Sequence, residues 1–290
     1  EFRRVLFRSE YFISRKYNGL DLFFSEIRNN ISDDDVEVYL RLYALLYADD
    51  TIVMAESAAE LQRALHAVYE YCELWHLTVN TSKTKIVIFA RGKVKVYPVF
   101  KFGEDEVAGV DDYIYSGTVF NYNNSFNKAI AKQVNQANRA LYSLKAKARR
   151  LNLPVDIVCE LFDKMISPIL LYGCEVWGFQ SLNHTEMFYR KFLKNLLHVN
   201  KFTPNCMVYG ELGRVNLQST VEKRMINFWL HLCDAKQSKL SNIMFRLLKT
   251  LYDQEVFQSK WAKKLRSILD NCGYSNMWDD YKSVKIGRAH

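Results

Sequence analysis

The sequence lacks the cysteine patterns of a zinc knuckle or of a disulfide scaffold. Its six cysteines are scattered through 290 residues, and no two of them form a C-x-x-C pair. Zinc knuckles and small disulfide-rich domains depend on closely spaced or paired cysteines. We therefore expect free thiols in a reducing compartment, with the protein located inside the cell.

Long apolar runs are absent as well. No stretch reaches the roughly 18 consecutive apolar residues of a membrane span, and no secretory leader is recognisable. The chain shows neither a repeat period nor a low-complexity linker, while 49% of its residues are hydrophobic and 14% are aromatic. This composition is typical of folded globular proteins and argues against contact with a membrane. The length is sufficient for two small domains with cores of their own.

Acidic and basic residues are distributed unevenly along the chain. Residues 10–123 carry 11 Lys/Arg and 18 Asp/Glu, whereas residues 124–284 carry 24 Lys/Arg and 13 Asp/Glu. The terminal stretches EFRRVLFRS (1–9) and KIGRAH (285–290) resemble translated sequencing adapters, so we leave both out of the fold prediction. The basic second half favours a phosphate-rich partner over an ordinary solvated surface.

The stretch LLYADDTIVM (45–54) places two adjacent carboxylates between two short apolar runs. This pattern predicts a β-hairpin with Asp49 and Asp50 at its tip. Neighbouring carboxylates repel each other unless a cation lies between them or water reaches both. A site made only of oxygen ligands suits Mg²⁺, with Mn²⁺ as an alternative. The three aspartates at 33–35 are instead expected to lie in a solvated loop.

The segment from Ser57 to Trp75 has the pattern of an amphipathic helix. Ser57 and Glu60 form a capping box at its start. Apolar residues recur at spacings of three and four from Leu61 to Trp75 and predict one buried stripe. This helix is expected to pack on the back of the hairpin.

A second amphipathic helix is predicted from Ser125 to Leu151. Besides its apolar seam it carries seven basic residues and no acidic one, namely Lys128, Lys132, Arg139, Lys145, Lys147, Arg149 and Arg150. A solvated helix usually mixes both signs of charge. We therefore expect it to contact nucleic-acid phosphates. Nucleic-acid binding without catalysis, and docking on the acidic half of the same chain, are the alternatives.

The stretch between the two helices is predicted to form strands. Residues 84–90 are rich in branched and aromatic side chains and predict one strand. Short strands with turns at Gly103, Gly109 and Gly117 are expected over residues 94–120.

Beyond the second amphipathic helix the periodicity is helical throughout. A helix is expected to begin at Pro154, with Val155 and Met165 among its inward-facing residues. Another capping box is predicted at Asn183 and Glu186. Three further helices are expected over residues 219–235, 240–253 and 257–271.

Taken in order, these segments resemble the reverse transcriptases of non-LTR (LINE-type) retrotransposons. YADD (47–50) is similar to their Tyr-x-Asp-Asp box, and LTVNTSKTKIVIF (77–89) to their Asn-x-x-Lys-Thr segment. VDDYIYSGTVF (110–120) is similar to the Tyr-Leu-Gly turn of the primer grip, and SPILLYGCEVWG (167–178) to the block beyond the thumb. The resemblance runs from about residue 20 to residue 252.

The resemblance implies an α+β fold. A partial polymerase palm, with an antiparallel sheet plus a helix, would occupy residues 10–123. An all-helical thumb would follow over 124–180, and a C-terminal helical region over 181–284. The implied activity is that of an RNA-directed DNA polymerase copying retrotransposon RNA into DNA. Its partners would be an RNA template, a DNA primer and deoxynucleotide triphosphates, in the nucleus or the cytoplasm.

The resemblance also implies residue roles. Asp49 would be the metal ligand and Asp50 an accessory ligand for two-metal nucleotidyl transfer. Tyr47 and Ala48 would lie near the primer terminus, and Lys83 near the incoming triphosphate, where its charge could offset that of the leaving pyrophosphate.

The same resemblance implies that part of the catalytic machinery is missing from this chain. The strand with the partner aspartate would fall near residues 1–15, where the adapter-like sequence stands. We therefore expect a C-terminal fragment that binds template–primer without extending it. Two alternatives stay open: a non-catalytic nucleic-acid-binding protein derived from a retrotransposon, and a helical interaction module in which YADD is coincidental.

Overall fold

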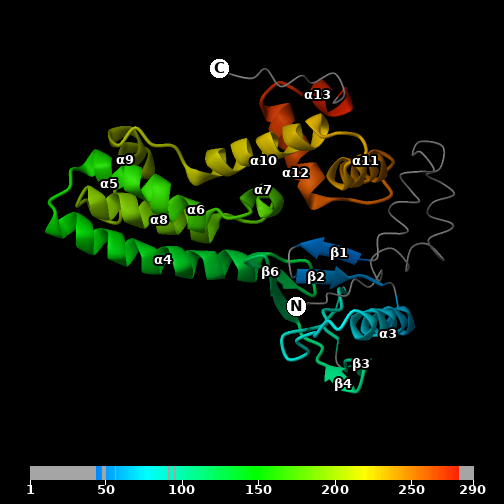
Figure 1. The fold of residues 1–290 in the computed structure, drawn as a ribbon. Coiled ribbons are helices and arrows are strands. Elements are labelled where there is room, and N and C mark those ends of the chain that lie inside the picture. Colours follow the sequence, from blue (N-terminus) through cyan, green and yellow to red (C-terminus); the bar gives the residue numbers. More distant parts are fainter. Residues whose placement is uncertain (1–43, 48–49, 56, 91, 95, 281–290) are drawn as a thin grey trace. The chain divides into compact units, whose positions relative to one another are not determined.

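The structure, a computed structural model, describes the residues 44–47, 50–55, 57–90, 92–94 and 96–280. They form two compact units, one ending at Phe126 and the other beginning at Asn127. The first unit combines antiparallel strand pairs with a helix, and the second is helical (Figure 1). The predicted α+β class is confirmed. The expectations for the two terminal stretches and for the aspartates at 33–35 lie outside the described residues.

An antiparallel hairpin carries the doubled aspartate. Strand β1 (Ala44–Tyr47) pairs with β2 (Asp50–Val53), and Tyr47 lies opposite Asp50 in the last pair before the connection. The hairpin prediction is confirmed, with Asp50 as the first residue of the second strand. The two connecting residues, Ala48 and Asp49, lie outside the described residues.

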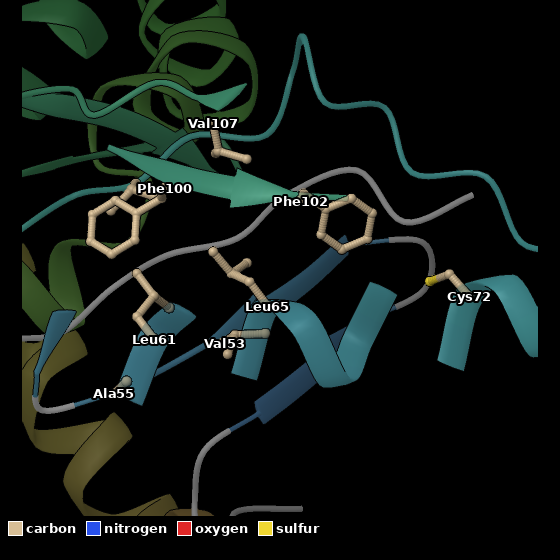
Figure 2. Close-up of a cluster of buried hydrophobic side chains, with 9 residues drawn as sticks. Val53, Ala55, Leu61, Leu65, Cys72, Phe100, Phe102 and Val107 are labelled. Carbon is tan, nitrogen blue, oxygen red and sulfur yellow. The ribbon is translucent and has the colours of Figure 1, made fainter. Parts of the chain in front are cut away.

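Helix α3 (Ala58–Leu74) packs on this hairpin. Leu61 and Leu65 are fully buried and lie in one apolar cluster with Val53 of β2 and with Phe100 (Figure 2). Burial of such a side chain contributes roughly 1.5–3 kcal/mol relative to exposure. Packing therefore holds the helix against the strands, as the sequence predicts.

The two ends of α3 differ in how well the sequence predicts them. At the first end, the Ser57 hydroxyl accepts a hydrogen bond from Glu60 N at 3.2 Å, which confirms the predicted cap. At the second end, the prediction that Trp75 is buried is wrong, because its side chain is 62% exposed. The helix ends at Leu74, so Trp75 is its C-cap with a non-helical φ of −100°, and His76 then reverses the chain with a left-handed φ of 53°.

Two more hairpins follow in the first unit, formed by β3 (Phe100–Phe102) with β4 (Asp105–Val107) and by β5 (Asp112–Tyr115) with β6 (Thr118–Asn121). Gly103 and Gly117 lie in their turns with φ of 61° and 80°, as predicted. The turn predicted at Gly109 is wrong. Gly109 instead forms an isolated parallel bridge with Ile86.

The strand predicted over residues 84–90 is not formed as a continuous strand. The segment bridges to its neighbours only locally, at Ile86 and through Ala90 N, which donates to Tyr122 O at 2.9 Å. Ile86 and the adjacent Val87 are both fully buried, but in different apolar clusters. The apolar run that suggests a strand is therefore explained by burial on two sides.

The second unit is built from helices joined by short connections (Figure 1). They are α4 (Asn127–Arg150), α5 (Val155–Leu161), the π-helix η1 (Phe162–Ile166), α6 (Ser167–Leu170), α7 (Cys174–Trp177), α8 (Asn183–Leu196), α9 (Asn205–Glu211), α10 (Leu217–Asp234), α11 (Leu240–Asp253), α12 (Lys260–Asn271) and α13 (Asn276–Asp279). Helices α10, α11 and α12 confirm the three helices predicted last. Within the described part of the chain, no helix is long and apolar enough to cross a membrane.

Two of the residues predicted to face inward are exposed, and the π-helix explains one of them, Met165. Val155 and Met165 are exposed, whereas Phe162 and Ile166 are fully buried. In η1 the Ser167 amide donates to Phe162 O, five residues back. A π-turn of this kind inserts one residue relative to the α-helical period. It therefore moves the buried position from Met165 to Ile166.

The capping box predicted at Asn183 and Glu186 is also wrong. Asn183 is the first helical residue of α8 and its side chain makes no cap. The carboxylate of Glu186 instead accepts hydrogen bonds from Gln218 N at 2.9 Å and from the Tyr209 hydroxyl at 3.1 Å. Glu186 thus ties α8 to α9 and α10.

Candidate nucleic-acid interface

Strand β2 is held from both sides, which fixes the backbone that bears Asp50. Ile52 packs with Val87 and Tyr113, and the next residue, Val53, packs in the cluster under α3. Alternating side chains of a strand point to opposite faces. The strand therefore lies between two apolar clusters. This packing fixes the backbone of β2, which begins at Asp50.

The metal role of the acidic pair stays a prediction. The side chains of Tyr47 and Asp50, like the whole of Ala48 and Asp49, lie outside the described part of the structure. Among the side chains that are described, no group of three His, Cys, Asp or Glu residues could hold a metal ion.

The Asn-x-x-Lys-Thr segment is a tight turn built by its own side chains. Asn80 Oδ1 accepts hydrogen bonds from Lys83 N at 3.1 Å and from the Ser82 hydroxyl at 2.7 Å. The Thr84 hydroxyl donates to Asn80 O at 2.9 Å and is fully buried. Asparagine and threonine therefore lock the turn, and Lys83 is left as its exposed charge.

The hairpin of β5 and β6 ends in a tight turn. Ser116 and Gly117 have φ of 45° and 80°, and they connect the paired residues Tyr115 and Thr118. Positive φ at both central residues is the tight type I′ geometry. Ser116 is exposed at this tip. Its small side chain therefore takes no part in the core that anchors the hairpin.

Helix α4 presents a line of positive charge opposite its buried face. Lys128, Arg139 and Arg150 follow one another at intervals of eleven residues, which is close to three full turns. The buried side chains lie on the other side of the helix and include Ala137 and Leu144. The helix ends at Arg150, so the apolar seam stops one residue short of the prediction, and Leu151 is exposed.

The other basic residues of α4 lie beside this line. Lys132 follows Lys128 by one turn, while Lys145, Lys147 and Arg149 lie on the flanks. Among the described residues, Arg139, Lys147, Arg149 and Arg150 have no acidic partner within ion-pair distance. The helix thus carries charge that the described part of the protein does not neutralise.

Lys145 shows that the charge continues onto a neighbouring helix. Burial, followed by the positive charges of Arg149 and Lys191, lowers the pKa of Lys145. Lys191 belongs to α8, which packs against α4 (Figure 1). The sequence alone points to α4, because the proximity of Lys145 to Lys191 depends on the packing of two helices. The signal for α8 in the sequence is the group Arg190, Lys191 and Lys194, which lies in a segment (187–210) without Asp or Glu.

Comparison with known families finds a similarity in the first part of the chain. The reverse transcriptases, described as RNA-dependent DNA polymerases, match residues 19–149. The match includes the hairpin, α3, the further strand pairs and almost all of α4.

Two similar proteins have names that refer to mobile elements. A transposon-derived protein of Caenorhabditis elegans is 29% identical over 139 residues, which cover 47% of this chain and 48% of the relative. The RNA-directed DNA polymerase from the mobile element jockey of Drosophila melanogaster is 26% identical over 148 residues, which cover 48% of this chain and 16% of that protein. The matched part is about half of the first relative and much less of the second. No solved structure matches significantly.

These findings confirm the resemblance to the reverse transcriptase of a non-LTR retrotransposon. The strand pairs with α3 correspond to part of a polymerase palm, and a helical region follows it.

Proposed function

We propose that this chain is a template–primer-binding part of an RNA-directed DNA polymerase that copies retrotransposon RNA into DNA. The observation that carries the proposal is the charge of α4, with seven basic residues, no acidic one, and four basic side chains that no described residue neutralises. Contacts to phosphates neutralise such charge and release counterions. An RNA–DNA hybrid is recognised mainly through its backbone and its shape, which is the kind of contact a basic helix supports.

In the same proposal, the hairpin supplies the metal ligands. Asp49 and Asp50 would hold Mg²⁺ or Mn²⁺, since adjacent carboxylates on an anchored hairpin are oxygen ligands of the type that these ions take. When bound, the ions would stabilise the negative charge that develops during phosphoryl transfer. Tyr47 and Ala48 would adjoin the primer terminus. Lys83, presented by its locked turn, would offset charge on the leaving pyrophosphate.

We further propose that the isolated 290-residue chain binds template–primer but does not extend it. A two-metal site needs carboxylates from more than one segment of the chain, and one hairpin offers a single adjacent pair. The test measures fluorescence anisotropy of an RNA template annealed to a labelled DNA primer, and then adds Mg²⁺ and nucleotides. Binding without elongation is expected. Elongation by the purified chain would contradict the second half of this proposal and leave the first half standing.

The role of α4 is tested by removing two of its exposed charges. In Arg139→Gln/Lys147→Gln, two phosphate contacts are lost, and each contributes about 0.9 to the slope of log affinity against log salt. The slope for template–primer binding is therefore expected to fall by about 1.8, with affinity in low salt reduced at least tenfold.

A matched double variant on another helix serves as the control. Lys260→Gln/Lys263→Gln removes the same net charge from exposed positions of α12. It is expected to change the salt slope much less, because α12 mixes its basic residues with nearby acids. If the α4 variant and the α12 variant behave alike, binding depends only on net charge and α4 is not the duplex-binding element.

A further inference from the structure

The connection between α8 and α9 contains a turn that is held by hydrogen bonds. At the end of α8, His198 adopts a left-handed φ of 55°, and Val199 N donates to Lys194 O at 3.1 Å, which is the 6→1 hydrogen bond of a Schellman motif. Asn200 Oδ1 then accepts a hydrogen bond from Phe202 N at 3.0 Å. The backbone on both sides of Lys201 is therefore fixed by local hydrogen bonds.

Phe202 projects from this turn into solvent. Its side chain is 81% exposed, and Lys201 Nζ lies 4.8 Å from the centre of its ring. Lys194 Nζ donates to Lys201 O at 2.8 Å, which ties the turn back to α8. A single exposed apolar side chain is ordinary on a protein surface. Here, however, the ring is presented by an anchored turn, and a cation, Lys201, lies over it.

The lysines beside Phe202 continue the basic surface of α4. Lys191 is exposed on α8 and lies one turn before Lys194, so both occupy the same side of the helix. Helices α4 and α8 pack against each other, and the positive charge of Lys191 helps to lower the pKa of Lys145, so the end of α4 lies beside this part of α8. A continuous track thus runs from α4 across α8 to the turn at Phe202.

Acidic residues are missing from both stretches that form this track. Residues 113–155, which include α4, contain no Asp or Glu, and neither do residues 187–210, which include most of α8 and the turn. Solvated helices usually alternate charges of both signs. Two segments distant in sequence therefore share one sign of charge where they pack together, as a polyanion-binding surface requires.

We propose that Phe202 is a stacking platform for an unpaired base, and that Lys191 and Lys201 bind phosphates of the same single strand. Single-stranded nucleic acids are held by this combination of a basic surface and aromatic side chains on which bases stack. A protein-docking site would instead need apolar neighbours around the ring, whereas the side chain that lies over the Phe202 ring is that of Lys201. The inference builds on the proposed function, since it places single-stranded template next to the helix that holds duplex.

The central test is Phe202→Ala in the full chain, with labelled oligo(dT) and oligo(U) as single-stranded probes. Stacking of one base contributes about 1–3 kcal/mol. We therefore expect affinity for the single strands to fall about 5- to 150-fold, whereas affinity for a blunt-ended template–primer duplex stays within about twofold. Phe202→Trp should retain single-strand affinity, and its added indole fluorescence should be quenched when the oligonucleotide binds.

Two further variants complete the test. Tyr274→Ala removes another exposed aromatic side chain, outside the track, and is expected to leave single-strand binding unchanged. Lys191→Gln/Lys201→Gln should reduce the salt slope for single strands by about 1.4, at about 0.7 per phosphate.

The outcomes separate this inference from the proposed function. Unchanged single-strand affinity in Phe202→Ala, or the same loss for blunt duplex and single strand, overturns the stacking platform. If Arg139→Gln/Lys147→Gln changes neither the duplex affinity nor its salt slope, the proposed role of α4 is wrong. In that case a Phe202-dependent loss of single-strand affinity would still support the platform.

Discussion

Replacing Asp49 with Asn is expected to slow primer extension by about a thousandfold or more in an extension-competent polymerase that contains this hairpin. The substitution keeps the size of the side chain but removes the charge that would hold Mg²⁺. Metal ions contribute several kcal/mol of transition-state stabilisation in phosphoryl transfer, and about 4 kcal/mol corresponds to a thousandfold in rate. Single-turnover incorporation of one nucleotide measures the loss. Template–primer affinity should stay nearly unchanged, because α4 and not the hairpin is proposed to hold the duplex.

The same substitution elsewhere in the acidic half provides the control. Asp34→Asn removes an identical charge from the run of three aspartates that is predicted to be a solvated loop. It is expected to retain near-normal extension. If Asp49→Asn extends primers as fast as Asp34→Asn, the acidic pair is not a metal site. The reading of a nucleic-acid-binding protein without catalysis would then be preferred.

Features that depend on neighbouring residues were well predicted from the sequence. The hairpin around Asp50, the cap at Ser57 and the helix of α4 each follow from a local pattern. The turn that presents Lys83 is also local, since Asn80 and the buried Thr84 lie within four residues of each other. In each of these cases the hydrogen bonds that define the structure close within a few residues, so the sequence contains the whole cause.

Features that depend on how the chain packs were predicted less well. Met165 has the correct α-helical spacing to be buried, but the π-turn at Phe162 shifts the register by one residue. Glu186 has the correct spacing for a capping box, but Tyr209 and Gln218 take its carboxylate. The partners of Glu186 come from α9 and α10, and Phe162 stacks on Phe192 of α8. The spacing of apolar and polar residues within one helix does not reveal which residues of other helices will contact it.

In the candidate site, too, some features can be predicted from local sequence and others depend on packing. The basic residues of α4 are visible in sequence, because seven charges of one sign on one helix are unusual. Phe202 is not visible in the sequence, because a single phenylalanine in the polar segment 200–205 belongs to no periodic pattern that would separate exposure from burial. Its position beyond a left-handed residue, on a turn that points out from the helices, is what exposes it. The continuity of its lysines with α4 likewise depends on the contact between α4 and α8.

Gly178 is expected to tolerate no side chain, and Gly178→Ala should destabilise the second unit by about 2–3 kcal/mol. A Cβ atom at this position would lie 2.5 Å from Val221 Cγ1, 2.6 Å from Cys174 O and 2.8 Å from Met225 Sδ. Val221 and Met225 are fully buried on α10, so a shift of either side chain would disturb the core. The φ of −62° at Gly178 suits any residue, so the cost comes from packing and not from backbone strain. Urea unfolding, followed by helical circular dichroism, measures the loss.

Gly210→Ala is the matched control, because it makes the same chemical change where no atom lies within 4 Å of the added Cβ. Gly210 lies inside α9, and alanine there reduces the freedom of the unfolded chain and favours the helix, which should stabilise the protein by about 0.5–1 kcal/mol. The two glycine variants are thus expected to shift the unfolding midpoint in opposite directions. A Gly178→Ala protein as stable as Gly210→Ala would mean that α7 can move away from α10. The close packing of these two helices would then not be a fixed feature of the second unit.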